Sequence, residues 1–113
     1  MSKFLECMES YKTQNAELNL GLSEQLLEGI AKSLGPSIYN ADSSKVSGTD
    51  KSELDRVKQN FLIKKLGLSD GAALDAAIAE TVEKMGSSNK SKYRVIFYAI
   101  LAVKFGKESM FTK

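Results

Sequence analysis

The stretch of the sequence best suited to bind a charged ligand is SSNKSKYR, at residues 87–94. Serine and asparagine are common helix caps, and a helix that begins here would direct free backbone N–H groups toward solvent beside several basic side chains. Phosphate and other anions bind at such helix ends. The pattern predicts an anion or nucleic-acid site, and the alternative is an ordinary solvated helix end. The candidate residues are Ser88, Asn89, Lys90, Lys92 and Arg94.

A second candidate site lies in LGPSIYNADSSKVSGTD, at residues 34–50, which contains the only proline of the chain. Tyr39, Asn40 and Asp42 supply a phenol, an amide and a carboxylate, and an enzyme could use the phenol or the carboxylate as its acid–base group. The alternative is a connecting loop. Ile38 and Tyr39 would each cost about 1.5–3 kcal/mol if left in water, so we expect them to anchor a short turn or 3₁₀ segment on the core.

Other combinations that support catalysis are incomplete. The chain has no histidine, and its one cysteine, Cys7, has Glu6 and Glu9 nearby, which do not activate a thiol. Ser87 and Lys90 have the spacing of a Ser–Lys nucleophile pair but lack the motifs that accompany it. We find no phosphate-binding loop or dinucleotide fingerprint. A calcium loop from Asp42 to Glu53 would have Val46 and Ser47 where an oxygen ligand and a glycine belong. The sequence therefore predicts no catalytic residue, no cofactor and no metal.

The elements that must position these residues are helices. Apolar side chains recur at helical spacing in five segments, and glycines follow the second, third and fourth of them as stop signals. The last segment contains VIFYAILAV, which is apolar on every side and therefore typical of a helix surrounded by others. We expect a single all-α domain over residues 1–113, a compact bundle around a buried C-terminal helix, with one long loop between the second and third helices. The predicted helices span residues 3–18, 24–34, 51–66, 71–85 and 90–105.

Capping residues predict where these helices begin. Ser23 is expected to cap the second helix, and Asp50 with Glu53 forms a capping box at the third, in which each side chain satisfies a backbone N–H of the other. The expected caps of the last two helices are Ser69 or Asp70 and Ser88 or Asn89.

Composition limits the setting in which the protein acts. Residues 1–56 carry six Lys and Arg against nine Asp and Glu, whereas residues 57–113 carry ten against five, so the charge is unevenly placed. The longest apolar run has nine residues, fewer than the roughly 20 that span a bilayer, and no signal peptide is visible. One cysteine cannot form an internal disulfide. We therefore expect a cytoplasmic protein without a membrane partner.

Several phrases of the sequence resemble a bacterial family of domains of unknown function, number 2853. The resemblance covers residues 26–109 and is most specific at GPSIYNAD (35–42), NFL (60–62) and KFGKE (104–108). It implies a short cytoplasmic bacterial protein and supplies no activity, cofactor or catalytic residue. It also favours a family role for the 35–42 segment over a chance connector.

These observations favour a non-enzymatic helical module that binds another protein or a copy of itself. Met110 and Phe111 lie beyond the last helix, where exposed apolar side chains would dock on a partner. The first alternative is nucleic-acid or phosphate binding at residues 88–94, with further lysines on other helices. The second is an enzyme with its site at Tyr39, Asn40 and Asp42.

Overall fold

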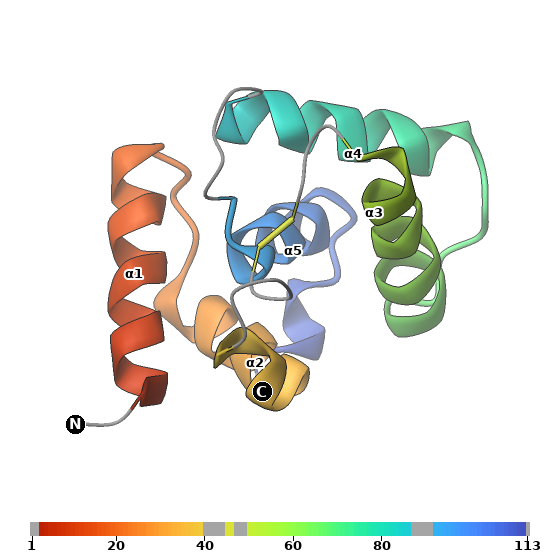
Figure 1. Cartoon of the computed structure of the whole chain (residues 1–113). Helices are drawn as coiled ribbons and strands as arrows, with labels where there is room; N and C mark the ends of the chain where they lie inside the picture. The colour runs from red at the N-terminus through yellow and green to blue at the C-terminus, as the bar shows by residue number, and fades with distance from the viewer. Residues whose placement is uncertain (1–2, 40–44, 47–49, 87–91, 113) are drawn as a thin grey trace.

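The computed structural model describes residues 3–39, 45–46, 50–86 and 92–112 (Figure 1). Five α-helices lie in these ranges and confirm the predicted all-α bundle. A π-helical segment, η2 (Val57–Lys65), continues the third helix, and two 3₁₀ turns, η1 (Gly35–Tyr39) and η3 (Glu108–Met110), follow the second and the last. The α-helices are α1 (Lys3–Glu17), α2 (Glu24–Leu34), α3 (Lys51–Arg56), α4 (Ala72–Met85) and α5 (Arg94–Lys104).

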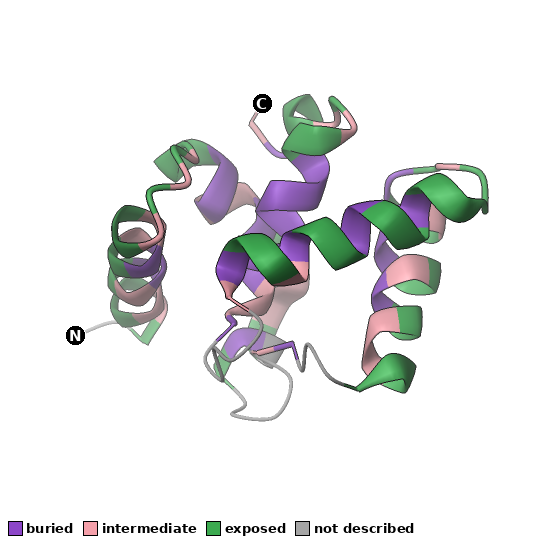
Figure 2. Cartoon of the chain, turned by 90° about the horizontal axis from the view of Figure 1, so that it is seen from above, coloured by how far each residue is buried: buried purple, intermediate pink, exposed green. Residues whose placement is uncertain are grey.

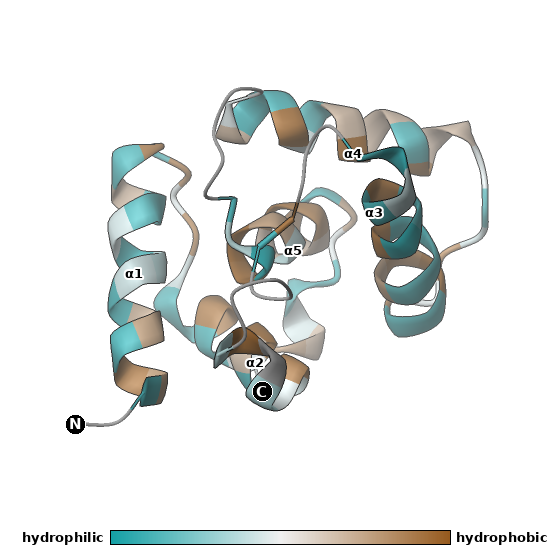
Figure 3. Cartoon of the chain, in the orientation of Figure 1, coloured by the Kyte–Doolittle hydropathy of each residue, from teal (hydrophilic) through white to brown (hydrophobic). Residues whose placement is uncertain are grey.

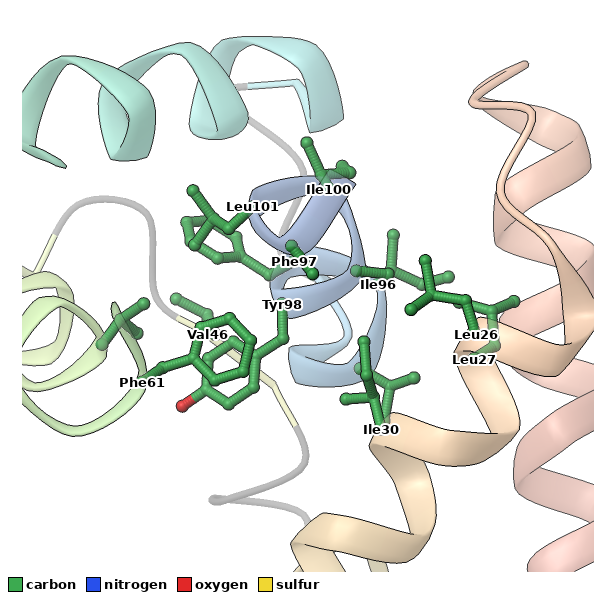
Figure 4. Close-up of a cluster of buried hydrophobic side chains, with 14 of the residues drawn as sticks. Leu26, Leu27, Ile30, Val46, Phe61, Ile96, Phe97, Tyr98, Ile100 and Leu101 are labelled. Atoms are coloured by element: carbon green, nitrogen blue, oxygen red, sulfur yellow. The ribbon is translucent and has the colours of Figure 1, made fainter. Parts of the chain in front are cut away.

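Helix α5 lies at the centre of the fold, and every residue from 95 to 102 is buried. Helices α1, α2 and α4 pack around it (Figures 1 and 3). In the core, side chains of α2 point toward Ile96, and Phe61 of η2 stacks on Tyr98 with 3.9 Å between ring centroids (Figure 4). The prediction of a last helix surrounded by the others is confirmed.

Two helix starts and one helix end follow the predicted local chemistry. Ser23 Oγ accepts the N–H of Leu26 at 3.1 Å, so it caps α2. Gly35 ends α2 with φ +65°, a backbone conformation that favours glycine. At α3, the Asp50 carboxylate accepts the N–H groups of Ser52 and Glu53, at 2.9 and 3.4 Å.

The prediction that the Glu53 side chain in turn satisfies a backbone N–H at the start of α3 is wrong. The Glu53 carboxylate does not return to the start of α3, because it binds the guanidinium groups of Arg94 and Arg56. A distant cation therefore outcompetes the local backbone N–H. The extent of this helix is confirmed, although its second half is π-helical and not α-helical.

The predicted cap of α4 is also wrong. The helix begins after Gly71, with no side-chain cap. Asp70 instead binds the ammonium of Lys58 on η2 at 2.8 Å, and this ammonium lowers the pKa of Asp70. Lys58 Nζ also lies 3.2 Å from Asp75 on α4, so one lysine joins η2 to the beginning of α4.

The predicted start of the fifth helix is wrong by one turn, because α5 begins at Arg94 and not at residue 90. Tyr93 is extended and forms an isolated antiparallel bridge with Lys45. The Val46 N–H donates to the Lys92 carbonyl at 2.8 Å, so this carbonyl is used in pairing with the long loop. The predicted caps Ser88 and Asn89 lie outside the described residues.

The C-terminal segment folds back on the bundle, which corrects the expectation that Phe111 is exposed. Phe111 is buried, and its ring stacks near Phe61 with 6.2 Å between centroids. Gly29 permits this approach, because a Cβ there would lie 2.0 Å from the Phe111 carbonyl oxygen. Met110 does remain exposed.

The outward sides of α1, α3 and α4 are exposed (Figure 2). Among the helices of the described residues, none combines the length and the apolar character needed to cross a membrane.

Candidate functional site

Residues adjacent to the two predicted sites, Ile38 and Tyr93, both contact α1. The Cys7 thiol of α1 lies 3.9 Å from the Ile38 carbonyl of η1. One turn later, the ring of Tyr11 meets the ring of Tyr93 edge to face, with 5.4 Å between centroids. Ile38 is buried and Tyr39 is 45% exposed, so only the first of the two expected anchors is buried. The remaining loop candidates, Asn40 and Asp42, lie outside the described residues.

Arg94 is the centre of a polar cluster at the beginning of α5. Its guanidinium donates to the Tyr98 hydroxyl at 3.0 Å and to the Lys45 carbonyl at 3.3 Å. It also forms an ion pair with Glu53 of α3. Both side chains of this pair are about 15% exposed or less, so water screens the pair only weakly. Burial lowers the pKa of Arg94, but Tyr98 and Glu53 outweigh burial and raise it.

A second polar group joins α1 to the residues just before α5. Gln14 is buried, and its Oε1 accepts the N–H of Tyr93 at 3.3 Å. Lys92, one residue earlier, is only 1% exposed, and burial lowers the pKa of its ammonium. The side chain of this predicted anion-binding residue is therefore enclosed by protein.

The described members of the predicted anion site, Lys92 and Arg94, make contacts within the fold. Ser88, Asn89 and Lys90 lie outside the described residues, so anion binding by this set stays a prediction. Within the described ranges, no three Cys, Asp or Glu side chains are placed to hold a metal ion. Arg94 fastens the long loop, at the Lys45 carbonyl, and α3, at Glu53, to α5. Gln14 joins α1 to the residue just before α5.

Tyr11 provides a test of this packing at alkaline pH. Burial, with smaller contributions from Cys7, Tyr93 and Tyr39, raises the pKa of the Tyr11 phenol above its ordinary value of 10.0. Its contribution to stability is therefore complete below about pH 10 and is lost as the pH rises toward the folded-state pKa, by up to about 1.4 kcal/mol per pH unit.

Tyr11→Phe removes this dependence. Urea unfolding at about pH 8 and about pH 11 is expected to show a smaller alkaline loss of unfolding free energy in Tyr11→Phe than in the unmodified chain. Taking the difference between the two proteins removes the contribution of Lys92, which both proteins share. Equal losses in both would show that the Tyr11 phenol titrates as if exposed.

The surface beside α4 carries two grooves. The first lies between α3 and α4 and has a volume of about 370 Å³. Its floor contains Leu54 and Ile78, and charged side chains of both signs, among them Lys51, Asp55 and Asp75, line its rim. Lys58 is shared between Asp70 and Asp75, so Asp75 is only partly neutralised.

The second groove lies between α4 and α5 and has a volume of about 220 Å³; we call it the α4/α5 groove. Ile100 is buried at its floor, and Figure 4 shows this side chain directed toward α4. Val103 is 48% exposed, and an ion pair between Lys104 and Glu80 joins the two helices. Its lining residues are Glu80, Thr81, Lys84, Ile100, Val103 and Lys104.

No pattern in the sequence marks the α4/α5 groove, because neither helix alone indicates it. VIFYAILAV is apolar on every side, so no periodicity distinguishes Val103 from its buried neighbours. Val103 is the last residue of that run, and Lys104 follows it. This loss of apolar character at the helix end is the one signal that could have marked an exposed valine.

Comparison with known proteins identifies one family. The family described as Protein of unknown function (DUF2853) matches residues 8–109, nearly the whole chain. No curated protein matches the sequence. The match agrees with the resemblance inferred from the phrases at residues 35–42, 60–62 and 104–108.

Proposed function

The chain belongs to the DUF2853 family of proteins of unknown function, and since that description assigns no activity, we propose a function from the surface. The protein is a non-enzymatic interaction module that binds an amphipathic helix in its α4/α5 groove. The proposed setting is the bacterial cytoplasm, on the strength of the family resemblance.

The main support for this proposal is the exposed valine of the groove, Val103. Val103 belongs to the most buried helix of the fold, yet 48% of it is accessible. With Ile100 beneath it, Val103 offers an apolar surface to a partner. The groove volume of about 220 Å³ is below the roughly 300–1,000 Å³ of ordinary small-molecule pockets, which favours a single protein side chain as the occupant.

The charges around the groove indicate what kind of helix binds. Lys84 on α4 makes no ion pair with any residue that the structure describes, whereas Lys104 is neutralised by Glu80. A cation that no described carboxylate neutralises, beside an apolar surface, complements a partner that places a carboxylate next to a large apolar side chain.

The two alternatives have less support. Phosphate or nucleic-acid binding needs accessible cations, but Lys92 is buried and Arg94 is bound to Glu53. An enzyme at the long loop would use Tyr39, Asn40 and Asp42, of which the structure describes only Tyr39. The Tyr39 hydroxyl makes no hydrogen bond to another described residue. Steep salt dependence of oligonucleotide binding, lost on charge reversal of Lys90, would favour nucleic-acid binding over our proposal.

Substitution of Val103 tests the proposed interaction. In affinity capture from a bacterial lysate, Val103→Asp is expected to retain at least about tenfold less of the partner than the unmodified chain, because a carboxylate would be buried against it. Met110→Asp is the matched control, since Met110 is also an exposed apolar residue but lies outside the groove. Equal loss in both variants, or in neither, would contradict binding at the groove.

A further inference from the structure

We propose that the partner helix is α1 of a second copy of this chain. This inference rests on the proposed function and names the occupant of the α4/α5 groove. Leu5 of α1 enters the groove of the neighbouring copy, against Ile100 and Val103, and Glu9 of the same helix meets Lys84.

The apolar part of this contact is the pairing of two exposed side chains. Leu5 is 61% exposed, more than any other large apolar residue that the structure describes, and Val103 at 48% is the next. Both lose their contact with water when Leu5 fills the groove. A volume of about 220 Å³ has room for one such side chain.

The charges of the two surfaces are complementary. Leu5 and Glu9 are one turn apart on α1, so they lie on the same face of the helix. The Glu9 side chain is 75% exposed, and its one ion-pair partner among the described residues is Lys12, at 3.3 Å. Such an exposed pair is easily exchanged for another. Lys84, at the rim of the groove, supplies the opposite charge.

The contact must form between two copies. Within one chain, α1 packs on α2, α5 and η1, and its beginning lies at the opposite end of the molecule from α4 (Figure 1). The two surfaces are different, so each copy can offer both α1 and the groove to its neighbours. Such pairing gives either a closed assembly or a short chain of copies.

Sedimentation velocity of the full chain over a wide concentration range tests the pairing. We expect the average mass to rise with concentration for the unmodified chain. Leu5→Asp and Val103→Asp should each weaken association at least about tenfold. Glu9→Lys and Lys84→Glu should each weaken it as well, and the two together in one chain should restore it. Met110→Asp is the control and should associate normally.

All of these positions are exposed, so circular dichroism should show an unchanged fold in each variant. A strictly monomeric unmodified chain would overturn the pairing, as would association that ignores Leu5 and Val103 or a double charge reversal that fails to restore it. If the chain is monomeric yet captures another protein in a Val103-dependent way, self-pairing is wrong and the proposed function stands. If it is monomeric and captures nothing, both are wrong.

Discussion

Arg94→Met is expected to lower the free energy of unfolding by about 3 kcal/mol, because breaking an enclosed ion pair leaves the remaining charge without its main partner. Among the described residues, the Glu53 carboxylate would keep Arg56 as its cation, whose nearest nitrogen is 3.5 Å away and whose side chain is 68% exposed. The Lys45 carbonyl and the Tyr98 hydroxyl would also lose a donor. Urea unfolding followed by circular dichroism measures the change.

A double variant separates the ion pair from the other contacts of Arg94. Arg94→Met with Glu53→Gln should cost less than the sum of the two single changes, because the second substitution removes the carboxylate that the first leaves unpaired. Strictly additive losses, or a loss below about 1 kcal/mol in Arg94→Met, would show that the pair is effectively solvated and does not fasten α3 to α5.

Gly29→Ala is expected to lower the free energy of unfolding by about 2 kcal/mol, although alanine favours helices more than glycine does. A Cβ at this position would lie 2.0 Å from the Phe111 oxygen and 2.8 Å from its carbonyl carbon. Both atoms are backbone, so the C-terminal segment must move and the burial of the Phe111 ring is lost. Thermal or urea unfolding would show the loss.

The sign of this effect should reverse when the C-terminal segment is removed. In a chain that ends at residue 107, Gly29→Ala no longer meets Phe111 and should raise the free energy of unfolding by up to about 1 kcal/mol through helix propensity. The same destabilisation in the full-length and the shortened chain would contradict the packing of Phe111 on α2.

Local chemistry predicted the parts of the fold that depend on neighbours in sequence. Ser23 and Asp50 cap their helices, Gly35 ends one, and the apolar run at residues 95–103 marks the central helix. Each of these features is decided within a few residues of chain, which is the range over which periodicity and capping rules apply.

Contacts between distant residues decided the parts that local rules missed. Glu53 and Asp70 have suitable types and spacing for capping, but each finds a cation on another element. Residues 92 and 93 suit a helix, yet they pair with the long loop at Lys45 and Val46. A single sequence does not show which distant groups will meet.

The candidate binding surface was hidden for the same reason. Lys84 and Val103 are ordinary residues of two separate helices, and only the packing of α4 on α5 brings them to one groove. Conversely, Arg94 has the type and position of a ligand-binding residue, and the fold uses it for internal contacts. The bundle was therefore more predictable than the site.

Photo-crosslinking in cells most directly tests whether the α4/α5 groove is the binding surface. A photoreactive amino acid would replace Val103 in one version of the chain and Tyr39, which is similarly exposed on the long loop, in another. We expect crosslinked products from position 103 and none from position 39. Products from position 39 alone would place the partner on the loop and contradict binding at the groove.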